Sequence, residues 1–457
     1  MKRKPPTMER RQYLTETPVP ELICTLAVPT MISMLVTGIY NAADTYFVGR
    51  ISTEATAAVG LVFSVMAVIQ ALGFFCGQGS GNFLSRLLGA GNRERAEEVA
   101  STGFAMALFL GLCTALFGNL FAVPLARFLG AGDLTLKDTL AYLRIILLGA
   151  PFMMCQCVIN NQLRFQGSAF YAMVGLMSGA IVNIVLDPLL IFVLDLGVPG
   201  AALATVSGQV IGFTVLLLGS LRGDNIHFEP SKIRLRVHDL LEIMNGGLPS
   251  LARQGLAAVS VVLLNRSAYF YGGDAAIAGM SIVNRAMQLL ASALIGFGQG
   301  YQPVCSYNYG ARNFHRVREG YFFCVKWGTA LMLTASVGCL LFPAHVVAFF
   351  RNDPAVIAVG TVALRWQAAA LPLMATTVLT NMMLQATGQG IRSTITSSAR
   401  NGLFFIPLIL TLPRFFGLHG VEMTQAIADV LSFLLALPFA YFCLRRMHRA
   451  HTEQMQQ

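Results

Sequence analysis

Three aspartates stand inside long apolar stretches of the sequence, where a charged side chain is rarely found. They are Asp44, Asp187 and Asp429. A carboxylate at the centre of a membrane-spanning helix costs on the order of 2.5 to 3.5 kcal/mol. A carboxylate kept there can take up a proton, or it can bind a monovalent cation together with other oxygen ligands. These residues are therefore candidates for H⁺ or Na⁺ binding.

Two of these aspartates belong to larger polar groups. The first group recurs at spacings of three and four residues, which places its members on one side of a helix: Thr37, Tyr40, Asn41 and Asp44. In a later stretch, Asn183 and Asp187 are four residues apart, and Pro188 weakens the helix beside the carboxylate. Two such faces could enclose a cavity in the first half, where Thr205 could add a hydroxyl ligand for Na⁺.

Each aspartate also has a structural alternative. Asp44 could lie near a membrane surface and contact water or a basic residue. Asp187 could belong to a turn before Pro188, where aspartate is common. Asp429 could pair with Arg266 or Arg285 between helices of the second half.

The elements that position these residues are predicted to be transmembrane helices. Charged residues make up 12% of the 457 residues, where about 25% is typical, the apolar fraction is 55% and the mean hydropathy is +0.63. So few charges cannot cover a soluble surface. Twelve apolar spans are predicted, near residues 22–48, 55–78, 99–122, 139–161, 170–194, 200–221, 241–271, 275–300, 321–343, 356–384, 395–417 and 420–444.

The distribution of the 32 Lys and Arg predicts the orientation in the membrane. With both termini in the cytoplasm, 21 of them fall in cytoplasmic segments, five in external loops and six in spans. This bias follows the positive-inside rule, so a multi-pass protein of the cell membrane with both termini cytoplasmic is predicted. The net charge of +10 is spread over short loops, so nucleic acid is not expected as a partner.

The two halves of the sequence resemble each other at a fixed offset of 221 residues. Gly77-Gln78-Gly79 aligns with Gly298-Gln299-Gly300, and nine of the 22 positions from 77 to 98 are identical to their counterparts. Six spans per half make the repeats parallel, with a substrate path expected between the halves. The predicted fold is an all-α integral membrane protein of twelve transmembrane helices in two homologous six-helix bundles. Its predicted parts are a cytoplasmic tail (1–20), a bundle (21–222), a cytoplasmic linker (223–240), a second bundle (241–446) and a cytoplasmic tail (447–457).

Four segments together resemble the MATE (multidrug and toxic compound extrusion) transporters, and most closely the MepA/DinF-like branch. They are Asp-Thr-Tyr-Phe-Val-Gly (44–49), Leu-Leu-Gly-Ala-Gly-Asn (87–92), Asn-Ile-Val-Leu-Asp-Pro (183–188) and Gly-Ala-Ala-Leu-Ala-Thr (200–205). The resemblance implies a V-shaped pair of bundles that exports amphipathic, often cationic compounds in exchange for H⁺ or Na⁺. By the same resemblance, the cation-coupling network consists of Tyr40, Asp44, Asn160, Asn183, Asp187 and Thr205.

The sequence departs from the family pattern in two places. Thr37 stands where some members carry Gln, and predicted spans 7 and 10 carry no carboxylate in their interior, where the NorM-like branch has its coupling carboxylates. The nearest polar groups there are Gln254 and Gln367. The residues that we predict to contact the substrate are Thr37, Asn41, Gln254, Arg285 and Asp429.

The function predicted is a secondary active multidrug exporter that works by alternating access. It needs no cofactor or metal beyond the H⁺ or Na⁺ gradient, and a monomer is expected because one chain supplies both halves. The alternative is a flippase or exporter of a lipid-linked or metabolic substrate, which Arg253, Arg266 and Arg285 would favour. An enzyme is not expected, because no two Asp are adjacent, as a Mg²⁺-dependent prenyl transferase would require, and no nucleotide motif is present.

Overall fold

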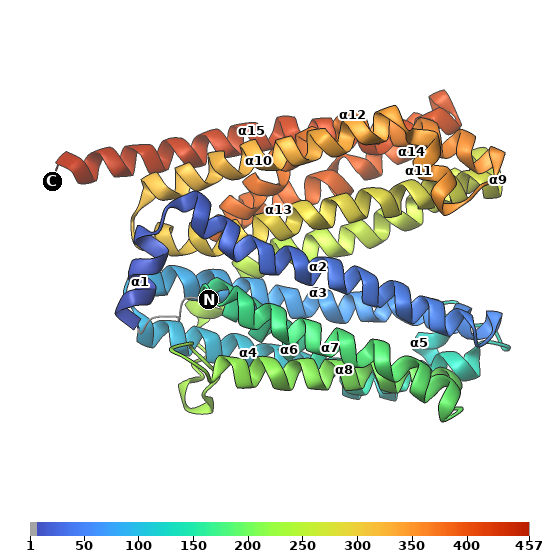
Figure 1. The fold of residues 1–457 in the computed structure, drawn as a ribbon, viewed down its shortest axis with the longest axis horizontal. Coiled ribbons are helices and arrows are strands. Elements are labelled where there is room, and N and C mark those ends of the chain that lie inside the picture. The colour runs from blue at the N-terminus through green and yellow to red at the C-terminus, as the bar shows by residue number, and fades with distance from the viewer. Residues whose placement is uncertain (1–6, 457) are drawn as a thin grey trace. The chain divides into compact units, whose positions relative to one another are not determined.

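A computed structural model describes residues 7–456, and within that range the regular elements are all helices (Figure 1). The first half contains α1 (Thr7–Glu16), α2 (Val19–Gly49), α3 (Thr53–Gly89), α4 (Arg93–Leu120), α5 (Ala122–Phe128), α6 (Leu136–Phe165), α7 (Ala169–Pro188), the π-helical turn η1 (Leu189–Val193) and α8 (Gly197–Ser220). The second half contains the short turn η2 (Pro230–Lys232), α9 (Val237–Gly310), α10 (Phe314–Leu341), α11 (Pro343–Phe350), α12 (Pro354–Ala386), α13 (Gly390–Ser398), the π-helical turn η3 (Ala399–Leu403), α14 (Phe405–Phe416) and α15 (Leu418–Gln456).

Helix ends repeat in the two halves at the offset found in the sequence. The loops that follow α3 and α9 are each three residues long, and they lie 221 residues apart. The loops that follow α6 and α12 have the same length and the same separation. The matched ends are Gly89 with Gly310, Arg93 with Phe314, Phe165 with Ala386, Ala169 with Gly390, and Gly197 with Leu418. The repeat therefore describes the folded structure as well as the sequence.

Eleven helical segments within the described residues are long and apolar enough to cross a membrane. The predicted spans 241–271 and 275–300 both fall in α9, which runs for 74 residues. At Gly273 the backbone takes φ 65° and ψ −158°, a conformation open mainly to glycine, so the chain turns there without a separate loop. Counting α9 as two spans gives twelve.

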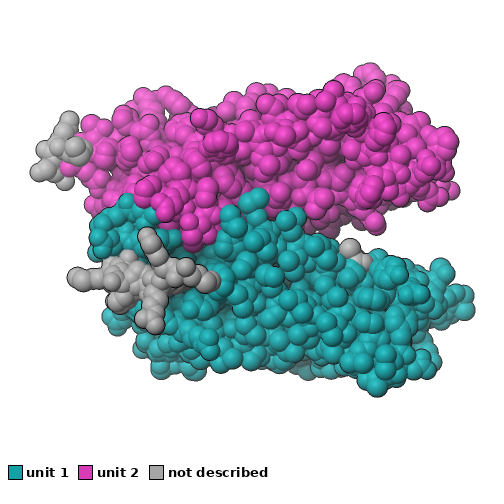
Figure 2. All heavy atoms as spheres, viewed as in Figure 1, with its two compact units in different colours: residues 1–17, 28–247 teal, residues 18–27, 248–457 magenta. Residues whose placement is uncertain are grey.

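The described chain forms two compact units, which Figure 2 colours separately. One unit holds the residues up to Thr17 together with Val28–Gly247, and the other holds Pro18–Ala27 together with the chain from Leu248. Close packing explains why the first turns of α2 belong to the second unit, because a Cβ on Gly300 would lie 2.5 Å from the Cα of Ala27. The first turns of α9 belong to the first unit for the same reason, since Gly79 contacts the backbone of Ile243.

Most of the described residues in the two predicted cytoplasmic tails are helical. Of the predicted tail 1–20, residues 7–16 form α1 and α2 begins at Val19, while residues 1–6 lie outside the described residues. At the other end, α15 continues without a break to Gln456, and residue 457 lies outside the described range.

The predicted linker is attached to the first unit by ion pairs. Arg95 of α4 lies 2.7 Å from Asp239 at the start of α9, and Glu97 of α4 lies 2.7 Å from Lys232. The hydrogen bonds from Lys232 to Glu97 and Glu229 raise the pKa of its ammonium group, which keeps the pair charged near neutral pH. The linker is therefore a fixed part of the first unit.

Removing Arg95 is expected to destabilise the first unit, because its partner Asp239 is only 2% exposed. A buried carboxylate left without its partner is strongly unfavourable, and since Arg95 itself is partly exposed we expect Arg95→Gln to cost about 1 to 3 kcal/mol. Thermal unfolding of the detergent-purified protein measures this. The matched control is Arg127→Gln, whose partner Asp133 is 90% exposed, and its effect should stay below about 1 kcal/mol. Equal losses in both variants would contradict the assignment.

Candidate cation site in the first bundle

Two glycines allow α7 and α8 to approach closely, and this contact positions the polar residues of both helices. A Cβ on Gly179 would lie 2.6 Å from the carbonyl oxygen of Gly208, and a Cβ on Gly208 would lie 2.7 Å from that of Gly179. Small residues at such contacts are typical of membrane helix pairs. One turn further along α7, the amide of Asn183 donates a hydrogen bond of 3.4 Å to the hydroxyl of Thr205 on α8.

Asp187 lies at the end of α7, where the helix changes form. Pro188 has no N–H to donate, and the chain continues as the π-helical turn η1 before α8 begins. The Asp187 side chain is fully buried, and neither of its carboxylate oxygens has a hydrogen-bond partner within the described chain. Buried polar atoms are nearly always paired, so this carboxyl group is set up for a ligand that the protein alone does not supply.

Asp44 of α2 lies in the same region of the first unit. It is 3% exposed, and its Oδ1 atom has no hydrogen-bond partner among the described residues. It is close enough to Asp187 for the two charges to interact, and both carboxylates interact electrostatically with Tyr40 of α2 and Tyr142 of α6. Three helices thus bring two acidic and two phenolic groups together.

A cavity of about 200 Å³ lies within the first unit, and of these four groups Tyr40 lines it, whereas Asp44, Asp187 and Tyr142 do not. Its lining includes five of the residues predicted for the network or for substrate contact: Thr37, Tyr40, Asn160, Asn183 and Thr205. Asn160 is held in place by the hydrogen bond that its amide donates to the carbonyl of Ala172, at 3.0 Å. The hydroxyl of Thr37 donates to the carbonyl of Ser33 in its own helix, at 2.8 Å.

The sequence did not indicate that two further residues, Arg164 and Tyr142, belong to this region. Arg164 falls in the predicted loop between the spans 139–161 and 170–194, but it occupies the last turn of α6, is 2% exposed and lines the cavity. Its guanidinium donates a hydrogen bond of 2.6 Å to Asn161. The polar run Asn160 to Arg164 could have signalled a buried polar surface. Tyr142 carries no such signal, because a single tyrosine in an apolar helix looks like any core residue.

The arrangement suits a small cation. Carboxylate, amide and hydroxyl oxygens are hard ligands, and two buried carboxylates near each other repel until a cation or a proton reduces their charge. The ligands come from α2, α7 and α8, so a cation held among them would link three helices.

Comparison with known proteins identifies the family. The MatE family model matches residues 29–189 and 249–411. This chain belongs to the MatE family. The multidrug export protein MepA of Staphylococcus aureus (strain N315) is 30% identical over 441 residues, which cover 96% of this chain and 97% of that protein. The MepA protein of Staphylococcus saprophyticus is also 30% identical, over 443 residues.

Solved structures of MatE family relatives have the same fold. The outward-facing conformation of a multidrug resistance MATE family transporter of the MOP superfamily matches with a TM-score of 0.89 and 27% identity, over 96% of this chain and 98% of that one. A MOP superfamily transporter from Pyrococcus furiosus, described as having a binding pocket of reverse polarity, matches equally well. The predicted fold class of two six-helix membrane bundles and the family resemblance are confirmed.

The remaining residues predicted to contact substrate do not line this cavity. Asn41 is exposed on α2, while Gln254, half-buried, and Arg285, exposed, lie on α9 in the second unit. The predicted pairing of Asp429 with Arg266 or Arg285 is wrong. Asp429 pairs at 2.7 Å with Arg400 and also accepts a hydrogen bond from Gln425.

Arg400 falls within the predicted span 395–417 and lies in the π-helical turn η3, whose wider winding directs its side chain toward α15. Asp429 is thereby neutralised within the second unit. Among the buried acidic residues of the described chain, the two without an ion-pair partner are those of the first unit, Asp44 and Asp187.

Proposed function

We propose that this protein is a secondary active exporter of amphipathic, cationic compounds, driven by exchange for H⁺ or Na⁺. The observation that carries the proposal is the pair of buried carboxyl groups, Asp44 and Asp187, with unpartnered oxygen atoms in a membrane bundle. The MepA relatives are named multidrug export proteins, which favours drugs as cargo. We further propose that the protein acts as a monomer in the cell membrane with both termini cytoplasmic, and that transport rather than enzymatic catalysis is its activity.

The proposed coupling depends on competition for charge. When a cation or proton occupies the site of Asp44, Asn183, Asp187 and Thr205, the negative charge near the cavity decreases, and the affinity of the cavity for a cationic substrate falls. Pro29 lies inside α2, so this helix can bend as Asp44 changes its contacts, which supports alternating access. One elementary charge that enters down a potential of 100 mV supplies about 2.3 kcal/mol, enough for a substantial uphill gradient of the exported compound.

A second candidate function is export of an anionic amphiphile, such as a lipid-linked or metabolic substrate. Arg164 favours it, because a buried guanidinium lines the same cavity as Asn183 and Thr205. An anionic headgroup would contact Arg164 while the apolar lining residues, among them Met34, Phe74 and Leu176, contact the tail.

Transport in proteoliposomes tests the proposal. Purified protein is reconstituted, and the movement of ethidium is followed by fluorescence under a pH gradient alone and under a Na⁺ gradient alone. We expect uphill movement of ethidium with at least one gradient, and its loss when an ionophore dissipates that gradient. Protein-free vesicles are the control. If neither the pH gradient nor the Na⁺ gradient drives ethidium transport, and an anionic amphiphile is transported instead, the second candidate function replaces this proposal.

A further inference from the structure

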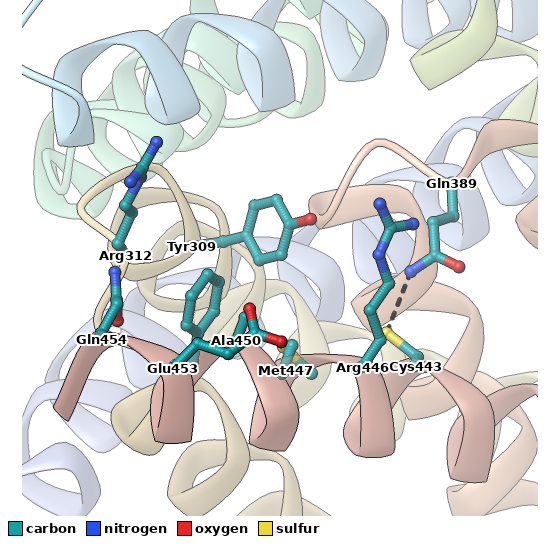
Figure 3. A pocket seen from close by; sticks show the side chains of 10 residues that line it. Tyr309, Arg312, Gln389, Cys443, Arg446, Met447, Ala450, Glu453 and Gln454 are labelled. Carbon is teal, nitrogen blue, oxygen red and sulfur yellow. Dashed lines mark hydrogen bonds between the residues drawn. The ribbon is translucent and has the colours of Figure 1, made fainter. Parts of the chain in front are cut away.

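A second cavity, of about 360 Å³, lies within the second unit and is built from three separate parts of its chain (Figure 3). Tyr309 and Arg312 come from the end of α9 and the loop before α10, Gln389 comes from the loop between α12 and α13, and Arg446 comes from α15. Figure 3 shows Tyr309 between the two arginines. The Gln389 side chain is fixed by its hydrogen bond to the sulfur of Cys443, at 3.0 Å.

The cavity is positively charged. Arg312 and Arg446 both line it, and within the described chain neither arginine has an ion-pair partner. Glu453 is the acidic residue of the lining. On α15, Arg445 and Arg449 border an adjoining hollow that Arg446 shares, which adds to the positive charge. Arginine suits a phosphate group, to which one guanidinium can donate two parallel hydrogen bonds.

The equivalent place in the first unit is filled by the protein itself. The repeat offset of 221 relates Gln389 to Ser168, which donates a hydrogen bond of 2.6 Å to Asn225 in the linker. Arg10 of α1 donates to both, at 3.1 Å to Ser168 and 2.8 Å to Asn225. In the second unit, α15 continues as a straight helix where the linker of the first unit turns back. Within the described residues, no such linker closes the cavity beside Gln389.

The position of the cavity indicates which ligand carries the phosphate. Leu437, Tyr441 and Phe442 on α15 are 42%, 58% and 55% exposed, and apolar side chains exposed on a spanning helix face lipid. Phe442 is one helical turn before Arg446 and borders the adjoining hollow. A lipid whose acyl chains lie along this face of α15 would have its headgroup at the arginines.

We propose that the cavity lined by Tyr309, Arg312, Gln389 and Arg446 binds the phosphate headgroup of an anionic phospholipid. The site is separate from the candidate cation site in the first unit, and the proposal does not depend on the direction or cargo of transport. Clusters of basic residues at the end of a membrane span commonly bind anionic headgroups.

Native mass spectrometry of the full chain in detergent tests the proposal. Phosphatidylglycerol, phosphatidylcholine and inorganic phosphate are added separately, and bound adducts are titrated. We expect saturable binding of phosphatidylglycerol, with weaker binding of phosphatidylcholine and of free phosphate. Each arginine at an anionic headgroup contributes about fivefold in affinity, so the double variant Arg312→Gln/Arg446→Gln should bind phosphatidylglycerol about 25-fold more weakly.

The control variant is Arg414→Gln, which removes an exposed arginine of the second unit from the last turn of α14, outside both hollows. It should bind phosphatidylglycerol within about twofold of the parent. Arg446→Lys keeps the positive charge and should retain most of the phosphatidylglycerol binding. This result would show that weaker binding in the double variant comes from the lost charge and not from misfolding. Equal losses in Arg414→Gln and the double variant, or inorganic phosphate binding as tightly as phosphatidylglycerol, would overturn the proposal.

Discussion

The Asp187→Asn variant, and separately the Asp44→Asn variant, should lose ion-driven efflux while still folding. Asparagine keeps the shape of each side chain but can neither take up a proton nor offer a negative charge to Na⁺. Both residues are buried and carry unpartnered oxygens, and their charges interact, so replacing either one removes one of the two negative charges of the site and one of its ligands. We expect at least a tenfold loss of gradient-driven ethidium transport in either variant, measured in proteoliposomes with equal amounts of protein.

The matched control for these variants is Asp195→Asn. Asp187 comes just before the π-helical turn η1, and Asp195 comes just after it. The side chain of Asp195 is exposed, and its backbone has φ 52°, a conformation that asparagine also tolerates. Its transport rate should equal that of the parent. If either buried variant carried ethidium at the parent rate under the same gradient, coupling would have to be assigned elsewhere in the chain.

A comparison of the gradients in these variants also separates the two candidate ions. A proton needs only one carboxyl group, whereas Na⁺ needs several oxygen ligands at once, including Asn183 and Thr205. Thr205→Ala should therefore reduce Na⁺-driven transport far more than proton-driven transport. Its hydroxyl already donates to the carbonyl of Ala201 at 3.1 Å, so its lone pairs face Asn183 and the site.

The sequence could predict those residues of the candidate site whose side-chain type is unusual in an apolar span. Asp44 and Asp187 stand out because a carboxylate in an apolar span is expensive, and Asn183 because it shares a helical face with Asp187. Tyr142 could not be found in this way, because its role depends on α6 packing beside α2 and α7. Arg164 was misplaced because a basic residue next to a predicted helix end looks the same whether it faces water or a buried cavity.

The fold shows the same division between local and tertiary information. Apolar length predicts the spans, and the 221-residue repeat predicts their grouping, since both are properties of the sequence itself. The partner of Asp429 could not be predicted, because Arg400 reaches it only through the π-helical turn η3, and winding of that kind depends on packing against α15. The kink of α9 at Gly273 likewise joins two spans that a loop was expected to separate.

The substitution Gly208→Val is expected to disrupt the candidate site by forcing α7 and α8 apart, although Gly208 itself offers no ligand. A valine there would place its Cβ 2.7 Å from the carbonyl oxygen of Gly179 and 3.1 Å from the Cβ of Asn183, so α7 and α8 would have to separate. Overpacking of this kind costs typically about 1 to 3 kcal/mol. The hydrogen bond from Asn183 to Thr205 is already 3.4 Å long, and even a small separation would break it.

Gly208→Val should therefore lower the thermal midpoint of the purified protein and reduce gradient-driven transport together, although it changes no polar group. Gly60→Val is the matched control, because Gly60 lies in the spanning helix α3 and has nothing within 4 Å of the position of an added Cβ. That variant should keep both the parent midpoint and the parent rate. A Gly208→Val protein with normal transport would show that the close approach of α7 and α8 is not what positions Asn183 and Thr205, since the two helices cannot keep their present distance around a valine.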